Sequence, residues 1–203
     1  MSDITRTSPA VSLWEFSSIA EGVQMADLIA KGAPVTAITT GTAHPGKYLV
    51  LVAGDTASVT VANEIIERAD AATLVDHMFL ADIAPAVAKA LTADTHTVEI
   101  AAEAAGVIET ASVAAAIESA DAAVKEADVT LGCLRLADGL GGKAFFVVDG
   151  TIGEVTSSVE AASTRAGDRL VSSVVIPLLT PEVRADLLVS FRFKDTIISR
   201  PAP

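Results

Sequence analysis

Residues 15–36, EFSSIAEGVQMADLIAKGAPVT, decide the fold because they recur ninety-four positions later as residues 109–130, ETASVAAAIESADAAVKEADVT. Both stretches run from a glutamate, through an Ala-Asp pair, to a lysine and a final Val-Thr. A repeat that keeps its register indicates a duplicated structural unit. The chain is therefore expected to contain two copies of one unit.

The likeness continues beyond this stretch at an offset of ninety-six positions. Gly46-Lys47 matches Gly142-Lys143, Leu74-Val75 matches Leu170-Val171, and Pro85 matches Pro181. A two-residue difference between Thr36 and Gly46, where a loop is expected, reconciles the two offsets. We predict a first domain over residues 10–92 and a second over residues 93–203 that includes a C-terminal extension. The join is a polar linker over residues 92–96, and each copy is long enough to fold as a unit.

Each copy shows the same order of strand and helix patterns, β-α-β-β-α-β. This is the split, ferredoxin-like arrangement, an α+β fold in which helices cover one face of a sheet. A short helix is expected after the last strand, near Pro85 and at residues 180–182, and residues 189–193 alternate like an extra strand. The predicted strands are 13–16, 35–39, 48–52 and 74–80 in the first copy, and 107–109, 129–136, 144–148 and 170–176 in the second.

The first helix of each copy has a readable start and a readable apolar face. Ser18-x-x-Glu21 matches a capping box, in which the serine and the glutamate each bind the other's backbone N–H. The apolar residues fall at helical spacing, which is typical of the packed face of a helix. They are Ile19, Val23, Ala26 and Ile29 in the first copy, and Val113, Ile117, Ala120 and Ala123 in the second.

Composition excludes several classes of protein. The net charge is −12, so the surface would repel nucleic acid and anionic lipids. No apolar run approaches the ~18 residues that span a bilayer, and residues 1–6 lack the pattern of a signal peptide. A single cysteine, Cys133, forbids an intrachain disulfide and suits a reducing compartment. These features predict a soluble cytoplasmic protein.

No motif indicates catalysis, and we expect no enzymatic activity and no catalytic residues. Residues 41–47, GTAHPGK, match the start of a phosphate-binding loop, but Tyr48 and a predicted strand follow where a Ser or Thr and a helix are needed. Cys133 lies inside a predicted strand and is interpreted as a buried, inert thiol. Glu15 and Glu109 could form an acid/base pair, but their equivalence favours one structural role present twice.

The repeated pattern resembles the bacterial microcompartment shell domain. The likeness rests on residues 106–110, GVIET, residues 116–125, AIESADAAVK, and residues 174–177, VVIP, and it covers roughly residues 11–190. Two fused copies resemble the tandem-domain shell proteins of propanediol-utilisation microcompartments. The resemblance implies a homotrimer that imitates a hexagonal tile, a place in the microcompartment shell within the cytoplasm, and other shell proteins as partners.

The resemblance also implies a central pore that passes small metabolites or holds a metal centre. Its lining would come from the loops Ala43, His44, Pro45, Gly46 and Leu140, Gly141, Gly142. In such relatives a cysteine stands directly before Pro-Gly-Lys and holds an iron–sulfur cluster. His44 takes that place here, which argues against a cluster because thiolates hold iron–sulfur centres. Three His44 side chains could instead ligate a metal ion, or simply line the opening.

The resemblance assigns Lys31 and Lys125 to the edge where a tile meets its neighbour; the alternative is an ordinary solvated lysine at a helix end. Residues 177–180, PLLT, replace the Pro-Arg-Pro-His of many relatives at the partner side of this edge. Two further hypotheses stay open. One is a ferredoxin-like trimeric regulator that binds a small effector between subunits, and the other is a metalloenzyme with a metal at His44.

Overall fold

The computed structural model describes residues 10–92, 103–137, 139–180 and 183. Each copy forms a four-stranded antiparallel sheet, with strand order β2-β3-β1-β4 in the first and β6-β7-β5-β8 in the second. The first copy contains β1 (Ala10–Phe16), α2 (Ile19–Gly32), β2 (Ala37–Ala43), β3 (Lys47–Gly54), α3 (Thr56–Ala69), β4 (Leu74–Leu80) and α4 (Pro85–Thr92). The second contains β5 (Ala104–Thr110), α5 (Val113–Glu126), β6 (Thr130–Leu136), β7 (Ala144–Gly150), α6 (Ile152–Ala166), η1 (Gly167–Arg169) and β8 (Leu170–Pro177). The predicted α+β fold with two β-α-β-β-α-β units is confirmed.

The strand pairing repeats between the two copies, apart from a bulge between Leu131 and Cys133 of β6 that β2 lacks. Glu15 pairs with Leu49 and Glu109 with Phe145, and both copies carry an irregularity directly after that glutamate where the first strand meets the last. Thr42 pairs with Tyr48, and the equivalent rung is Leu136 with Ala144. The two extra residues of the second copy therefore lie in the β6–β7 loop. The second strand of the first copy was predicted to start too early, since Val35 and Thr36 precede β2.

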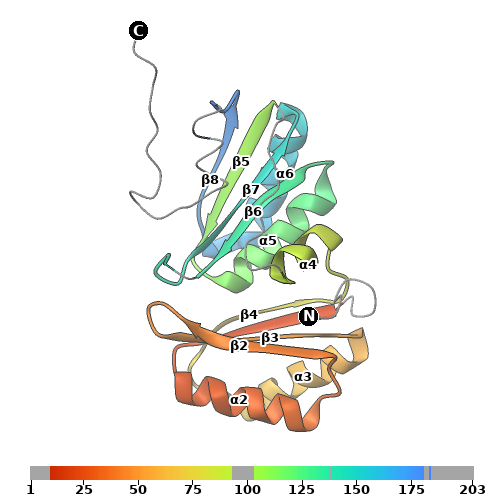
Figure 1. Cartoon of the computed structure of the whole chain (residues 1–203), viewed down its shortest axis with the longest axis vertical. Coiled ribbons are helices and arrows are strands. Elements are labelled where there is room, and N and C mark those ends of the chain that lie inside the picture. The colour runs from red at the N-terminus through yellow and green to blue at the C-terminus, as the bar shows by residue number, and fades with distance from the viewer. Residues whose placement is uncertain (1–9, 93–102, 138, 181–182, 184–203) are drawn as a thin grey trace.

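Two helices cover one face of each sheet (Figure 1). In the first domain, Trp14 and Phe16 of β1 are buried with Met25 and Ile29 of α2 and with residues of α3. Side chains alternate along a strand, so the neighbours Leu13 and Glu15 point to the other face. That second face also lies inside the molecule, since every residue of β1 is buried.

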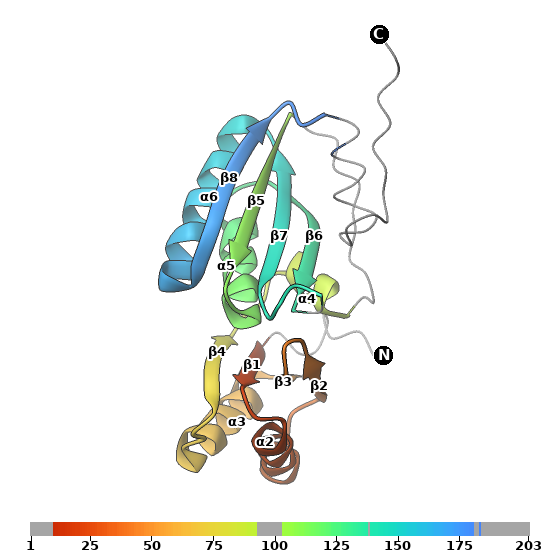
Figure 2. The same ribbon diagram turned by 90° about the vertical axis from the view of Figure 1, so that its left-hand side faces the viewer.

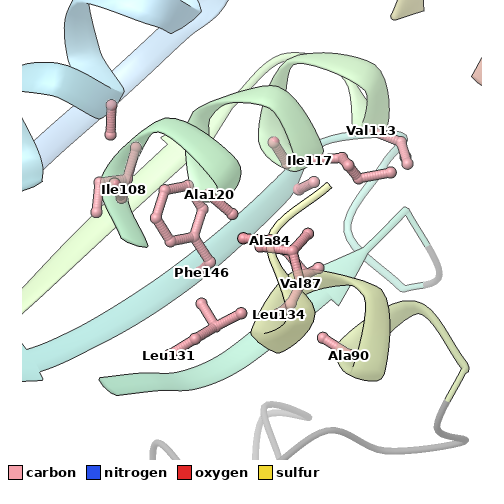
Figure 3. Close-up of a cluster of buried hydrophobic side chains, with 14 of the residues drawn as sticks. Ala84, Val87, Ala90, Ile108, Val113, Ile117, Ala120, Leu131, Leu134 and Phe146 are labelled. Carbon is pink, nitrogen blue, oxygen red and sulfur yellow. The ribbon is translucent and has the colours of Figure 1, made fainter. Parts of the chain in front are cut away.

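The second domain covers the open face of the first sheet. Figure 2 shows the start of α5 above β1 and β4, and α5 packs against both strands. Helix α4 follows β4 in the chain but packs on α5 and β6. Figure 3 shows Ala84, which directly precedes α4, and Val87 of α4 near Ile117 of α5 and Leu134 of β6. One apolar cluster therefore runs from the first domain through α4 into the second.

Of the capping box predicted at the start of α2, the serine half is confirmed and the glutamate half is wrong. Ser18 caps the helix, since its hydroxyl accepts a hydrogen bond from the backbone N–H of Glu21. The carboxylate of Glu21 instead accepts from the backbone N–H groups of Ala72 and Thr73 and from the Thr73 hydroxyl. The hydroxyl of Thr73 is the main cause that lowers the pKa of Glu21. A complete capping box stands elsewhere, between Thr151 and Glu154 of α6.

The two predicted apolar stripes differ in burial. All four residues of the second-copy stripe are fully buried, whereas Ile19 and Val23 of the first copy are 44% and 49% exposed. The physical reason is that α5 has two neighbours, its own sheet and the first domain, while α2 packs only on its own domain. The stripe interpretation was therefore right for α5 and wrong for the first half of α2 within one chain.

Some sequence predictions lie outside the described residues. These are the linker beyond Thr92, the short helix at residues 181–182 and the extra strand at residues 189–193. The domain boundaries at residues 92 and 93 border the same part of the chain and stay predictions. Within the described residues, no helix is both long enough and apolar enough to cross a membrane.

Candidate functional site

Two loops that the sequence predicts to line a pore meet in the structure. The first loop (residues 43–47) joins β2 to β3, and the second loop (residues 139–143) joins β6 to β7; both lie on the left-hand side of Figure 1. A Cβ atom added at Gly142 would come within 3.2 Å of Lys47 Cε and of Pro45 Cδ. Gly142 also has a φ of +81°. Glycine is therefore required where the two loops touch.

A buried carboxylate ties the two domains together beside this contact. Lys47 Nζ lies 2.9 Å from Glu15 Oε2 and also donates to the carbonyl oxygen of Gly142 at 3.3 Å. Glu15 Oε1 accepts from the backbone N–H of Ala114 at 2.7 Å. The side chain of Glu15 is fully buried, and a negative charge is favourable at the start of a helix, here α5. Glu15 has the structural role that the sequence analysis favoured.

The equivalent pair in the second copy lies at the surface. Lys143 Nζ lies 2.9 Å from Glu109 Oε1, and the two side chains are 50% and 37% exposed. The strand register is the same as for Glu15 and Lys47, so the difference comes only from what faces the two sheets. In the first copy, α5 covers the face of the sheet beside Glu15. No part of the described chain covers the equivalent face beside Glu109.

His44 is exposed and precedes Pro45, with which it forms a cis peptide bond. The neighbouring predicted lining residues differ in exposure: Pro45, Gly46 and Gly141 are exposed, Leu140 is half-buried, and Ala43 and Gly142 are buried. Among the described residues, no three His, Cys, Asp or Glu side chains gather into a possible metal site. The pore lining and the metal at His44 stay predictions.

The two predicted edge lysines close the last turn of equivalent helices. Lys31 pairs with Asp27 at 2.5 Å, and the Lys31 side chain is 71% exposed. Lys125 pairs with Asp121 at 2.7 Å and also donates to the carbonyl oxygen of Asp82 in the first domain. The role of both lysines at a tile edge stays a prediction.

Cys133 is fully buried in β6, and burial raises the pKa of its thiol to about 11. The predicted burial is therefore confirmed, and the raised pKa keeps the thiol protonated at neutral pH. The GTAHPGK motif runs from β2 through the first loop into β3. It has no helix start at which a phosphate could bind.

A polar cluster between the domains was not predicted from the sequence. Asp76 of β4 accepts a hydrogen bond from the Ser112 hydroxyl, which also caps α5, and lies 3.4 Å from Arg169 Nε. Arg169 further donates to the carbonyl oxygen of Val75 at 3.0 Å. A signal was present: the repeat places serine at 172 where the first copy has Asp76, so the two copies differ at this contact.

A family model for the BMC domain matches this chain twice, over residues 10–83 and over residues 104–179. The chain belongs to the BMC-domain family. It is 37% identical over 176 residues to bacterial microcompartment shell protein PduT of Citrobacter freundii, covering 84% of this chain and 92% of that protein. It therefore carries two BMC domains in tandem, and it is a structural protein of a bacterial microcompartment shell.

Solved structures agree with this assignment. A crystal structure of a microcompartment protein from Desulfitobacterium hafniense is 35% identical and superposes with a TM-score of 0.73, covering 88% of this chain and 98% of that one. A fused permuted hexameric shell protein of the RMM microcompartment is 20% identical, with a TM-score of 0.56 over 77% of this chain and 82% of that one, and shares the fold. The family resemblance seen in the sequence is confirmed.

Proposed function

We propose that three copies of this BMC-domain protein close into one tile of the shell, with six domains around a central pore. The observation that supports it is the bridge from Lys47 to Gly142, which places one loop of each domain side by side. Six equivalent loops around an axis would then alternate between the two types. Closed rings are the usual outcome when a subunit binds its copies head to tail.

The proposed pore passes small metabolites, and the role is structural rather than catalytic. Its lining is formed by Ala43, His44, Pro45 and Gly46 and by Leu140, Gly141 and Gly142. Both loop lysines are paired with glutamates, Lys47 with Glu15 and Lys143 with Glu109, so the ion pairs offset their positive charges near the opening. Among these lining residues, His44 is the one with an exposed polar side chain.

We further propose that His44 from three chains forms the only metal site that the first loop offers. One chain supplies a single imidazole there, so three ligands need three copies, and a fourth position is left open. An iron–sulfur cluster does not fit this loop. The single cysteine of the sequence, Cys133, is buried in β6 and cannot reach the first loop as a thiolate ligand.

The proposed outer edge of the tile contacts other shell proteins through Lys31 and Lys125. Both lysines lie in the last turns of α2 and α5 and keep exposed side-chain surface. Their aspartate partners hold the amino groups in place along the helix, because residues four apart share one helix face. Tiles would meet at this edge.

Two measurements test the proposed tile: the mass of the protein in solution and electron microscopy of its assemblies. We expect light scattering to give three times the 20.7 kDa chain mass, and microscopy of concentrated protein to show flat sheets or tubes. A monomer at all concentrations would contradict the proposal. A discrete trimer that never forms sheets would instead support the regulator hypothesis.

Metal uptake tests the role of His44. We expect the trimer to bind one Zn²⁺ or Ni²⁺ per three chains, and we expect His44→Ala to abolish this binding. His77→Ala is the matched control, because His77 is exposed on β4 and away from the loops. Equal metal content in the wild type and the His44→Ala protein would show that His44 only lines the opening.

A further inference from the structure

The second sheet carries a small apolar cluster on the face that α5 and α6 leave open. In β7, Phe146 lies toward α5 (Figure 3), and side chains alternate along a strand, so Phe145 and Val147 point to the other face. The register pairs Val147 with Cys133 of β6, which therefore shares that face. The members of this open-face cluster are Ala105, Cys133, Phe145, Val147 and Leu179.

Burial falls along one rung of the open face, from β6 to β8. Cys133 and Val147 are both 0% exposed, Val107 of β5 is half-buried, and Val174 of β8 is 47% exposed. These four residues are consecutive partners across the sheet. The cover that buries the rung therefore lies over β6 and β7 and leaves β8 open.

The equivalent rung of the first sheet shows the opposite order. Thr39 of β2 is exposed and Leu51 of β3 is half-buried, whereas Leu13 of β1 and Met78 of β4 are 3% and 1% exposed. In that sheet, α5 of the second domain covers β1 and β4. The repeat thus serves as an internal control, because β6 and β7 have a cover that β2 and β3 lack.

The cover belongs to the same chain, because a single copy buries these residues by itself. Among the described residues outside the sheet, only Leu179 joins the open-face cluster, and one side chain is too small to bury β6 and β7. Leu179 also shows where the chain goes. The N–H of Leu178 binds the carbonyl oxygen of Glu103 beside the start of β5, and Leu179 then contacts the cluster. The chain therefore leaves β8 on the open face.

We propose that the C-terminal segment, residues 184–203, folds back from Leu179 and packs as an extended chain over the open-face cluster on β6 and β7. Phe191 and Phe193 supply its apolar side. They alternate with Ser190 and Arg192, so both rings fall on one side of an extended chain. The inference goes beyond the proposed trimer and does not depend on it, because the contact lies within one chain.

The length and the charge of the segment fit this place. Its twenty residues advance by ~3.3 Å each when extended, and strands lie ~4.8 Å apart, so about half of the segment crosses a four-stranded sheet. The segment has four basic and two acidic residues, although the net charge of the whole chain is −12. Positive charge suits the carboxylate of Asp149, which is 5% exposed and shares the face of Val147.

The cover changes what this face of the protein can do. It shields an apolar sheet surface that would otherwise attract other proteins. It also keeps the single thiol of the chain, Cys133, away from metal ions and oxidants, and burial raises the pKa of this thiol to about 11. Strand β8, with Val174, stays open.

The reaction of Cys133 with dithiobis(nitrobenzoate) tests the cover. The full chain should react slowly, because a buried thiol reacts only after local opening. We expect a chain that ends at Val183 to react at least about tenfold faster, because its thiol is accessible without such opening. A chain that lacks residues 1–9 is the control and should react like the full chain. Fluorescence of Trp14 and far-UV circular dichroism show that each chain is folded.

Paired substitutions test which side of the segment packs on the sheet. Phe191→Ser with Phe193→Ser should raise the rate of the thiol reaction, whereas Ser190→Ala with Arg192→Ala should leave it unchanged. Equal effects of the two pairs would overturn the extended arrangement. A rate that stays at the full-chain value in both the truncated chain and the phenylalanine pair would overturn the inference as a whole.

The linker between the domains is the other segment that could cover this face. Residues 93–102 join α4 to β5 and contain Val98 and Ile100, which also alternate with polar residues. They do not continue from Leu179, so we expect Val98→Ser with Ile100→Ser to leave the reaction of Cys133 unchanged. A faster reaction in this variant, with an unchanged rate in the chain that ends at Val183, would assign the cover to the linker and overturn the inference.

Photochemical cross-linking gives a readout that does not depend on thiol chemistry. With a photoreactive benzoylphenylalanine in place of Phe191, we expect cross-links to the tryptic peptides of residues 126–135 and 144–165, which contain β6 and β7. Irradiation of a mixture with isotope-labelled chain separates contacts within a chain from contacts between chains. Cross-links only to other peptides, or only between labelled and unlabelled chains, would overturn the inference. The proposed trimer would stand in either case.

Discussion

At the scale of single residues, Glu15 and Glu109 show how one residue type takes two environments. Both stand at the same rung of equivalent sheets and both bind the lysine that begins or precedes the neighbouring strand. Glu15 is fully buried because the start of α5 covers it, and the backbone N–H of Ala114 and the amino group of Lys47 satisfy its charge. Burial of a carboxylate is tolerated only with such partners.

Removal of the buried carboxylate should destabilise the chain strongly. We expect Glu15→Ala to lower the free energy of unfolding by about 3–5 kcal/mol, because Lys47 and the N–H of Ala114 lose their partner in a buried place. Glu15→Gln should cost less, since its amide oxygen still accepts a hydrogen bond. Urea unfolding at a concentration where the chain is monomeric measures both. Glu109→Ala is the control and should change stability by at most about 1 kcal/mol, as for exposed pairs.

At the scale of elements, the second helix packs on the first strand through different side chains in the two copies, α3 on β1 and α6 on β5. In the first copy, Ser12 of β1 donates to Asn63 of α3 at 2.8 Å. The equivalent positions hold Gly106 and Val159, and a Cβ at Gly106 would come 2.6 Å from Val159 Cγ2 and 2.9 Å from Val148 Cγ2. The polar pair of one copy is therefore replaced by close apolar contact in the other.

Two substitutions would introduce the polar pair of the first copy into the second copy. We expect Gly106→Ser alone to destabilise the protein by about 1–3 kcal/mol, because the added atoms collide with valines in a packed core. Gly106→Ser with Val159→Asn should recover part of the loss, because it recreates the Ser12–Asn63 pair. A double-mutant cycle from urea unfolding measures the coupling, which we expect to be about 0.5–3 kcal/mol. A coupling of zero would mean that the two positions do not depend on each other.

At the scale of the whole molecule, the two domains share one core. The cluster that contains Leu13 and Met78 of the first sheet also contains Ile117 of α5 and Phe146 of β7. Helix α4 adds Val87 to the same cluster. Separation of the domains would expose apolar side chains to water and break the hydrogen bond from the N–H of Ala114 to Glu15, and both losses oppose it.

The shared core predicts one cooperative unfolding transition. Trp14 is the only tryptophan and lies buried in the first domain, so its fluorescence reports that domain, while far-UV circular dichroism reports both. We expect the two signals to change together with urea, as in two-state unfolding. Val113→Asp should separate them, because a charge inside the interface weakens only the contact between domains. Two transitions in the wild type would show that each domain unfolds alone.

The repeat by itself determined the fold, the order of strands and helices, and the family. This was possible because the alternation of apolar residues in strands and their helical spacing in helices are local properties. Both patterns occur twice in the chain, at a nearly constant offset. The same local reading placed the start of α2 at Ser18 and the burial of Cys133 correctly. It placed the carboxylate of Glu21 wrongly, because the competing partners, Ala72 and Thr73, come from the turn before β4.

Only the tertiary structure decided which copy of each repeated residue is buried. Val113 and Ile19, Met78 and Val174, and Glu15 and Glu109 are equivalent in sequence, yet the first of each pair is buried and the second is partly exposed. The physical reason is that a chain of two domains makes the contact between them once. The second domain covers the sheet of the first, whereas no part of the chain that the structure describes covers the equivalent face of the second sheet.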